Sequence, residues 1–198
     1  FFGGLSNVVT QLLFIIDIIL IGELMTDPLM VTHYKYISII PFSLLFLPRV
    51  FMAADFVSLT EKIGQKVYIR NYIKSYQLFF SLLSLLIFSI SCFFSKSILL
   101  LFGKEYVNYS DSFVILIFGI TGIFIFRGIY GNLLSSIGKM SVNYYIVSIA
   151  ILINILSNFY LIPIYGIKGA AVTSSTLMWL TGIASWVCFN YLYKKKDY

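Results

Sequence analysis

Long apolar runs fill almost the whole chain, and they limit what it can fold into. Such runs are nearly free of charge and cover about 5–24, 35–54, 77–101, 112–134, 143–163 and 168–193. About 20 apolar residues suffice to cross the hydrocarbon core of a bilayer as a helix. No water satisfies the backbone there, so a span must be a helix or part of a closed barrel. The runs are too long for barrel strands and do not alternate with period two. They predict an all-α, polytopic membrane protein, with residues 1–198 as one six-helix bundle.

The composition excludes several other classes. Of the 198 residues, 60% are hydrophobic and only 11% are charged, whereas a soluble domain carries about 25% charged residues. In such a chain we do not interpret the net charge of +6 as a sign of nucleic-acid binding. Cys92 and Cys188 lie in apolar runs and suggest no disulfide framework, and His33 is the single histidine. We therefore expect no metal and no cofactor.

One connection carries a regular pattern of charge. Lys62, Lys66, Arg70 and Lys74 follow one another at steps of four in the stretch 55–76. This spacing places them on one face of a helix. The stretch predicts an amphipathic helix at the membrane surface. The alternative is a solvated loop.

The basic residues also predict an orientation. Eight Lys and Arg residues lie on one side, in 55–76, at Lys139 and in the tail 194–196, whereas four lie on the other side. Cytoplasmic loops carry the excess of positive residues, so both termini are expected in the cytoplasm. The chain opens FFGGLSN without a methionine, which suggests a fragment.

Three charged residues fall inside the predicted spans. Asp17 lies near the middle of the first, Arg49 follows Pro48 in the second, and Arg127 lies in the fourth. A charge at membrane depth costs at least a few kcal/mol and is a functional candidate by default. The alternatives are an ion pair between Asp17 and an arginine inside the bundle, and arginines that extend to the interface.

Two amide side chains share a helical face in the fifth span. Asn154 and Asn158 are spaced i, i+4. They would line a cavity or hydrogen-bond a neighbouring helix. Gly119 and Gly122 inside the fourth span suggest helix packing. Aromatic residues that flank the spans fit an interfacial belt, and they are Tyr34, Tyr36, Tyr106 and Tyr109.

The hairpin after Asn158 carries a more specific pattern. Asn154 and Asn158 are followed by LIPIYGIKGAA at 161–171, where Pro163 and Gly166 are expected to end the fifth span. Small residues then open the sixth span and permit close helix packing. The run Thr173 to Ser175 is not explained by a tight hairpin.

This hairpin resembles the pattern N-x-x-x-N-x-x-L-I-P-x-Y-G-x-x-G-A-A of polysaccharide flippases. These are the O-antigen and capsule exporters of the multidrug/oligosaccharidyl-lipid/polysaccharide superfamily. Three further stretches are similar to family patterns, and they are Ile16-Asp17 with Ile21-Gly22, Leu101–Tyr106 and Leu133–Lys139. Such proteins have twelve to fourteen spans in two lobes, and the chain resembles the C-terminal lobe.

The resemblance implies a transporter of lipid-linked glycan in the bacterial cytoplasmic membrane. Arg49 and Arg127 would bind its pyrophosphate or acidic sugars in a cavity that Asp17, Asn154 and Asn158 also line. The implied partners are the lipid-linked glycan, membrane lipid, an N-terminal lobe and the polysaccharide polymerase machinery. Without that lobe, the polar face of the bundle would be uncovered. The alternatives are a drug or cation exporter, and a membrane enzyme or structural partner in glycan assembly. No enzymatic motif occurs in the sequence, so we expect no enzyme.

Overall fold

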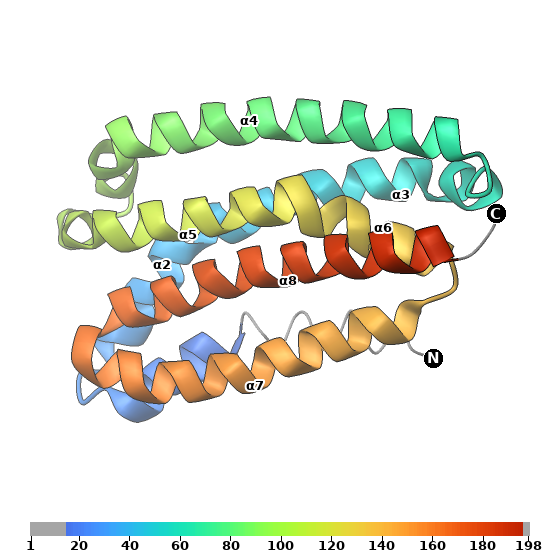
Figure 1. Cartoon of the computed structure of the whole chain (residues 1–198). Helices are drawn as coiled ribbons and strands as arrows, with labels where there is room; N and C mark the ends of the chain where they lie inside the picture. Colours follow the sequence, from blue (N-terminus) through green and yellow to red (C-terminus); the bar gives the residue numbers. More distant parts are fainter. Residues whose placement is uncertain (1–14, 196–198) are drawn as a thin grey trace.

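The computed structural model describes residues 15–195, which form helices joined by short turns and contain no strand. The first is a helical segment at 15–24. It is followed by α2 (Leu29–Leu44), α3 (Phe46–Glu61), α4 (Lys66–Leu100), the short 3-10 helix η1 (Lys104–Tyr109), α5 (Ser110–Gly122), the π-helical turn η2 (Ile123–Arg127), α6 (Gly128–Ser136), α7 (Met140–Tyr165) and α8 (Ile167–Lys195). The predicted all-α class is therefore confirmed, and Figure 1 shows the helices side by side along one axis.

Five helical stretches in the described part are long and apolar enough to cross a membrane. They are Leu29–Glu61, Lys66–Leu100, Lys104–Ser136, Met140–Tyr165 and Ile167–Lys195, with 26 to 35 residues each. By length and composition the chain belongs to the class of multi-pass membrane proteins. The first predicted span, 5–24, lies partly outside the described residues.

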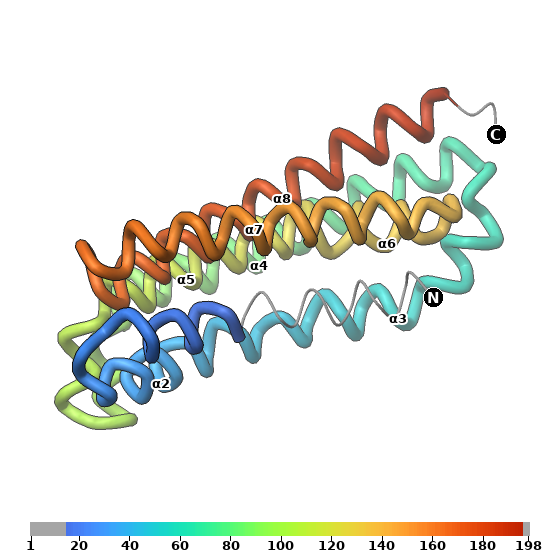
Figure 2. Tube along the Cα trace, turned by 90° about the horizontal axis from the view of Figure 1, so that it is seen from below, coloured from blue at the N-terminus to red at the C-terminus, as the bar shows by residue number. Residues whose placement is uncertain are grey.

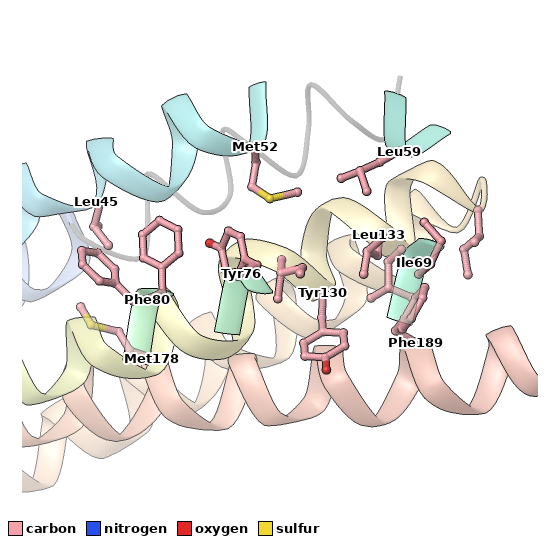
Figure 3. Close-up of a cluster of buried hydrophobic side chains, with 14 of the residues drawn as sticks. Leu45, Met52, Leu59, Ile69, Tyr76, Phe80, Tyr130, Leu133, Met178 and Phe189 are labelled. Carbon is pink, nitrogen blue, oxygen red and sulfur yellow. The ribbon is translucent and has the colours of Figure 1, made fainter. Parts of the chain in front are cut away.

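The stretch 55–76 differs from the expected single surface helix. Its first part, 55–61, ends α3, and its last part, 66–76, begins α4, with a turn at 62–65. Leu59 and Ile69 are both buried in one apolar cluster. Figure 3 shows Leu59, Ile69 and Phe189 meeting in this cluster. Burial of these apolar side chains folds the stretch back on itself, so both parts are the ends of long helices.

Proline and glycine set two helix boundaries. The helix break at Leu45 comes three residues before Pro48. Proline lacks an N–H and its ring clashes with the carbonyl four residues earlier, which here belongs to Leu44, the last residue of α2. In contrast, α7 continues past Pro163 to Tyr165. Gly166, with φ of 58°, ends it, because a positive φ favours glycine. Pro163 was thus wrongly expected to help end this span.

Helix α8 lies between α5 and α7 and packs closely on both (Figure 1). A Cβ atom added to Gly119 of α5 would lie 2.7 Å from the Cα of Ser175 in α8. One added to Gly169 of α8 would lie 2.4 Å from the carbonyl oxygen of Leu161 in α7. These glycines let the backbones approach, as helices in lipid require. The expectation of helix packing at Gly119 agrees with this geometry.

The turns gather at two ends of the bundle. At one end, Tyr193 donates a hydrogen bond to the carbonyl of Ile63, and Thr60 donates one to Ser136. At the other end, Lys168 forms an ion pair with Asp111 at 2.9 Å. Figure 2 shows the segment 15–24, α2 and α3 on one side of the bundle and α7 on the other. The polar residues of the spans lie between these two ends.

Candidate functional site

The first polar cluster surrounds Asp17 and lies inside the bundle. The Oδ2 atom of Asp17 accepts hydrogen bonds from the hydroxyl of Tyr34 at 2.7 Å and from the hydroxyl of Ser174. Its Oδ1 atom accepts from the Nδ2 atoms of Asn154 at 2.9 Å and Asn158 at 2.7 Å. All five side chains are fully buried, with 0% exposure. We call these five residues the Asp17 cluster.

Four elements build the Asp17 cluster. Asp17 comes from the helical segment 15–24, Tyr34 from α2, the two asparagines from α7 and Ser174 from α8. Asn154 and Asn158 reach the same carboxylate because residues four apart share one helical face. Nδ2 of Asn158 also lies 3.2 Å from Oδ1 of Asn154. Hydrogen bonding to a neighbouring helix, one of the two alternatives for this pair, is therefore present.

The carboxylate of Asp17 has four neutral donors and no cationic partner. Donors on both oxygens suit the ionised form, which only accepts hydrogen bonds. An ion pair with a buried arginine, expected as one alternative, is absent among residues 15–195. Oδ1 of Asn158 and Oγ1 of Thr173 are buried without a hydrogen-bond partner in the described structure. The cluster thus joins four helical elements, and one acceptor oxygen in it, Oδ1 of Asn158, has no hydrogen-bond partner in the described structure.

The second polar cluster surrounds Arg127 at the end of η2. Its Nη1 atom donates to Oδ1 of Asn143 at 2.9 Å and to the hydroxyl of Ser185 at 2.5 Å. Asn143 is held in turn, because its Nδ2 donates to the carbonyl of Gly131 at 2.6 Å and lies 3.2 Å from the hydroxyl of Ser135. Arg127, Asn143 and Ser185 form what we call the Arg127 cluster.

Only one of the three nitrogen atoms of the Arg127 guanidinium donates hydrogen bonds to residues 15–195. Its two hydrogen bonds both leave from Nη1, so Nε and Nη2 make none with residues 15–195. No carboxylate of the described chain pairs with it. Arg127 ends a π-helical turn between Gly122 and Gly128. Such turns occur frequently at functional sites, and a planar fork with spare donors suits a phosphate or carboxylate group.

The two clusters lie on the same seam between α7 and α8. Asn143 and Asn154 are 11 positions apart on α7, and Ser174 and Ser185 are 11 positions apart on α8. Eleven residues make three helical turns, or about 16 Å. Buried Val147, Ala150 and Leu177 fill the seam. The seam therefore carries two polar positions with an apolar layer between them.

Arg49 is not brought to either cluster. Its side chain is exposed on α3 and forms no hydrogen bond or ion pair with the residues that the structure describes. Asp17, Asn154 and Asn158 come together but are enclosed, so they do not line an open polar face of this chain as expected. Substrate contact by these residues stays a prediction.

Several residues of the clusters were not found from the sequence. Tyr34 was assigned to the interfacial belt, which is wrong, because it is fully buried against Asp17. Asn143 and Ser185 had no local signal. Ser174 did, since it lies in the hydroxyl run that a tight hairpin left unexplained. Groups of histidine, cysteine and acidic residues that could hold a metal are absent from the described part of the chain.

Comparison with known proteins finds a distant similarity to a protein named for capsule biosynthesis. Over 108 residues it is 35% identical to "Capsular polysaccharide biosynthesis protein CapF" of Staphylococcus aureus. The match covers 54% of this chain and 26% of that protein, so the chain spans only a part of its relative's length. No family model matches, and no solved structure matches significantly.

Proposed function

We propose that this chain is one lobe of a flippase that moves lipid-linked oligosaccharide or polysaccharide repeat units across the cytoplasmic membrane for capsule synthesis. Three observations support the proposal. The helices are suited to multiple membrane crossings, a relative is named for capsular polysaccharide biosynthesis, and the motifs around Asp17 and Asn154 resemble those of flippases. A transporter fits these features better than an enzyme, for which the sequence offers no motif.

The partly used guanidinium of Arg127 carries the proposal. Arg127 is partly buried, and a positive charge withdrawn from water with only neutral partners is unfavourable, so an anionic ligand would reduce this cost. Lipid-linked glycans carry a pyrophosphate, and many carry acidic sugars. Nε and Nη2 of Arg127 make no hydrogen bond with residues 15–195 and are suited to such a group. A cation exporter would instead need a free carboxylate, whereas Asp17 is surrounded by donors.

The test is capsule export by the full-length protein in its native host. Replacing Arg127 by alanine should lower surface polysaccharide at least tenfold, while the protein remains in the membrane. Arg127→Lys should restore export only in part, because lysine keeps the charge but not the planar fork. Lys104→Ala is the matched control, because Lys104 is an exposed cation distant from the Arg127 cluster along the chain.

Arg49 decides whether the proposed transport path includes one arginine of this chain or two. Since its side chain is exposed, it could contact substrate only where the rest of the transporter covers it. Loss of export in Arg49→Ala would place it in the transport path. Normal export in both Arg49→Ala and Arg127→Ala would show that the arginines only extend to the interface, and the proposed substrate contact would be wrong.

A further inference from the structure

One end of α4 carries an exposed basic stripe with no acidic partner. Lys66, Arg70 and Lys74 are all exposed and lie at steps of four on α4. No ion pair joins them to any acidic residue of the described chain. Like charges at i, i+4 destabilise a helix by a few tenths of a kcal/mol per pair. The stripe therefore weakens the isolated helix and favours binding of an anion from outside the chain.

The length of α4 places this stripe at the membrane surface. The helix has 35 residues, or about 52 Å, whereas the hydrocarbon core is about 30 Å thick. Residues 75–95 contain no charged side chain and form a run of 21 positions, which is long enough to cross that core. Residues 66–74 then extend through the headgroup layer.

The stripe is held in a fixed position by the opposite surface of the same helix end. Ile69 and Tyr76 are buried in the apolar cluster that includes residues of α3. The hydroxyl of Tyr72 donates to Oδ2 of Asp55 in α3 at 2.7 Å. Figure 3 shows Ile69 and Tyr76 directed into that cluster. The basic side chains cannot turn into the bundle and remain at its outer surface.

An exposed apolar face continues directly below the basic stripe. Leu78 and Leu85 are 64% and 63% exposed. They lie four and eleven residues after Lys74, on the same side of the helix. The basic groups lie at headgroup depth and the apolar face lies deeper in the membrane. A phospholipid has its phosphate and its acyl chains at the same two depths, so it can contact both.

The surrounding end of the molecule is also basic. Lys62, Lys139, Lys194 and Lys195 lie on the turns and the helix end that meet there. Among the described residues, Asp55 and Glu61 of α3 are the acids near them. We propose that the stripe Lys66–Arg70–Lys74 is a binding site for the headgroup of an anionic phospholipid. This inference goes beyond the proposed transport function and does not depend on it.

The test compares two lipids on the purified protein. Phosphatidylglycerol or phosphatidylcholine is added to the protein in neutral detergent, and native mass spectrometry counts the lipids that remain bound. A basic residue near a negative surface strengthens binding about fivefold. We therefore expect at least a tenfold preference for phosphatidylglycerol, and the preference should fall at high salt.

Two triple variants locate the site. The first is Lys66→Gln, Arg70→Gln, Lys74→Gln, and it should lose the preference at least tenfold. The matched control carries Lys35→Gln, Lys96→Gln and Lys104→Gln. These three residues are also exposed. Their substitution removes the same charge from other positions, so the preference for phosphatidylglycerol should change less than twofold. Circular dichroism verifies that each variant is folded. If the first triple variant does not fold, the single variant Arg70→Gln is measured in its place.

Three results would overturn the proposal. One is equal retention of the two lipids by the unchanged protein, which would favour an acidic protein segment as the partner of the stripe. Another is an equal loss in both triple variants, which would reflect overall charge rather than a site. The third is a preference that high salt leaves unchanged.

Discussion

At the scale of single residues, the carboxylate of Asp17 links the segment 15–24 to the helices around it. Its carboxylate accepts hydrogen bonds from four side chains on three other helices. A protonated carboxyl group carries a donor of its own, so it could not accept all four of these hydrogen bonds equally well. The residue therefore stabilises the junction of the segment 15–24 with α2, α7 and α8.

Replacing Asp17 by asparagine should lower stability by about 1–3 kcal/mol, because the new amide group turns an acceptor into a donor facing other donors. Thermal unfolding in detergent measures the change. Ser157→Ala, on the same helix as Asn154 and partly exposed, should shift the midpoint far less. An unchanged midpoint in Asp17→Asn would show that the cluster contributes nothing to stability.

The sequence predicted part of these residue contacts. Asp17, Asn154 and Asn158 could be selected because charged and amide groups are rare in apolar runs. The resemblance placed them around one cavity, but their direct hydrogen bonds could not be predicted, since these depend on how α7 packs against the segment 15–24. Tyr34 was missed for a similar reason. A tyrosine near a helix end fits both an interfacial belt and a buried hydrogen bond, and only the packing decides.

At the scale of elements, the close contact of α5 with α8 depends on glycine. A Cβ at Gly119 would lie 2.7 Å from the Cα of Ser175 and 2.8 Å from the sulfur of Met178. Backbone cannot yield as a flexible side chain can. The two helices would have to separate. Arg127 in η2 and Ser185 in α8 come after this contact along the chain, so separation would also affect the Arg127 cluster.

Gly119→Val should therefore destabilise the protein by about 1–3 kcal/mol, as overpacking of a core does. Gly64→Ala is the control, because a Cβ there would meet nothing within 4 Å, and its stability should remain equal or rise slightly. Unfolding by denaturant in detergent compares the two. Equal stability of Gly119→Val and the unchanged protein would contradict the close packing.

Helix existence could be predicted from apolar length, whereas helix ends could not. The runs 77–101 and 143–163 correspond to α4 and α7. The start of α4 at Lys66 was missed, because the basic residues of 55–76 were assigned to a separate surface helix and not to the end of the following span. The π-helical turn at Ile123–Arg127 has no simple sequence signal.

At the scale of the whole molecule, the basic residues favour one end of the bundle. The turn at 62–65, Lys139 and the end of α8 lie together there. The positive-inside rule predicts that this end faces the cytoplasm. The orientation of the chain in the membrane stays a prediction.

Cysteine labelling tests this orientation in intact cells. In a variant with Cys92 and Cys188 replaced by serine, a cysteine at Lys66 should resist a membrane-impermeant maleimide. A cysteine at Lys104, at the other end of α4, should react. Both positions are exposed, so access to the reagent depends on the side of the membrane. The reverse pattern would invert the proposed topology.

The most direct test of the proposed function is transport by the full-length protein that contains this chain, purified into liposomes with lipid-linked oligosaccharide. A lectin or glycosidase outside the vesicles reports how much glycan has crossed. We predict time-dependent crossing with the unchanged protein and at least a tenfold slower rate with Arg127→Ala at equal insertion. No crossing with the unchanged protein, or equal rates for both, would contradict an anion-binding flippase lobe.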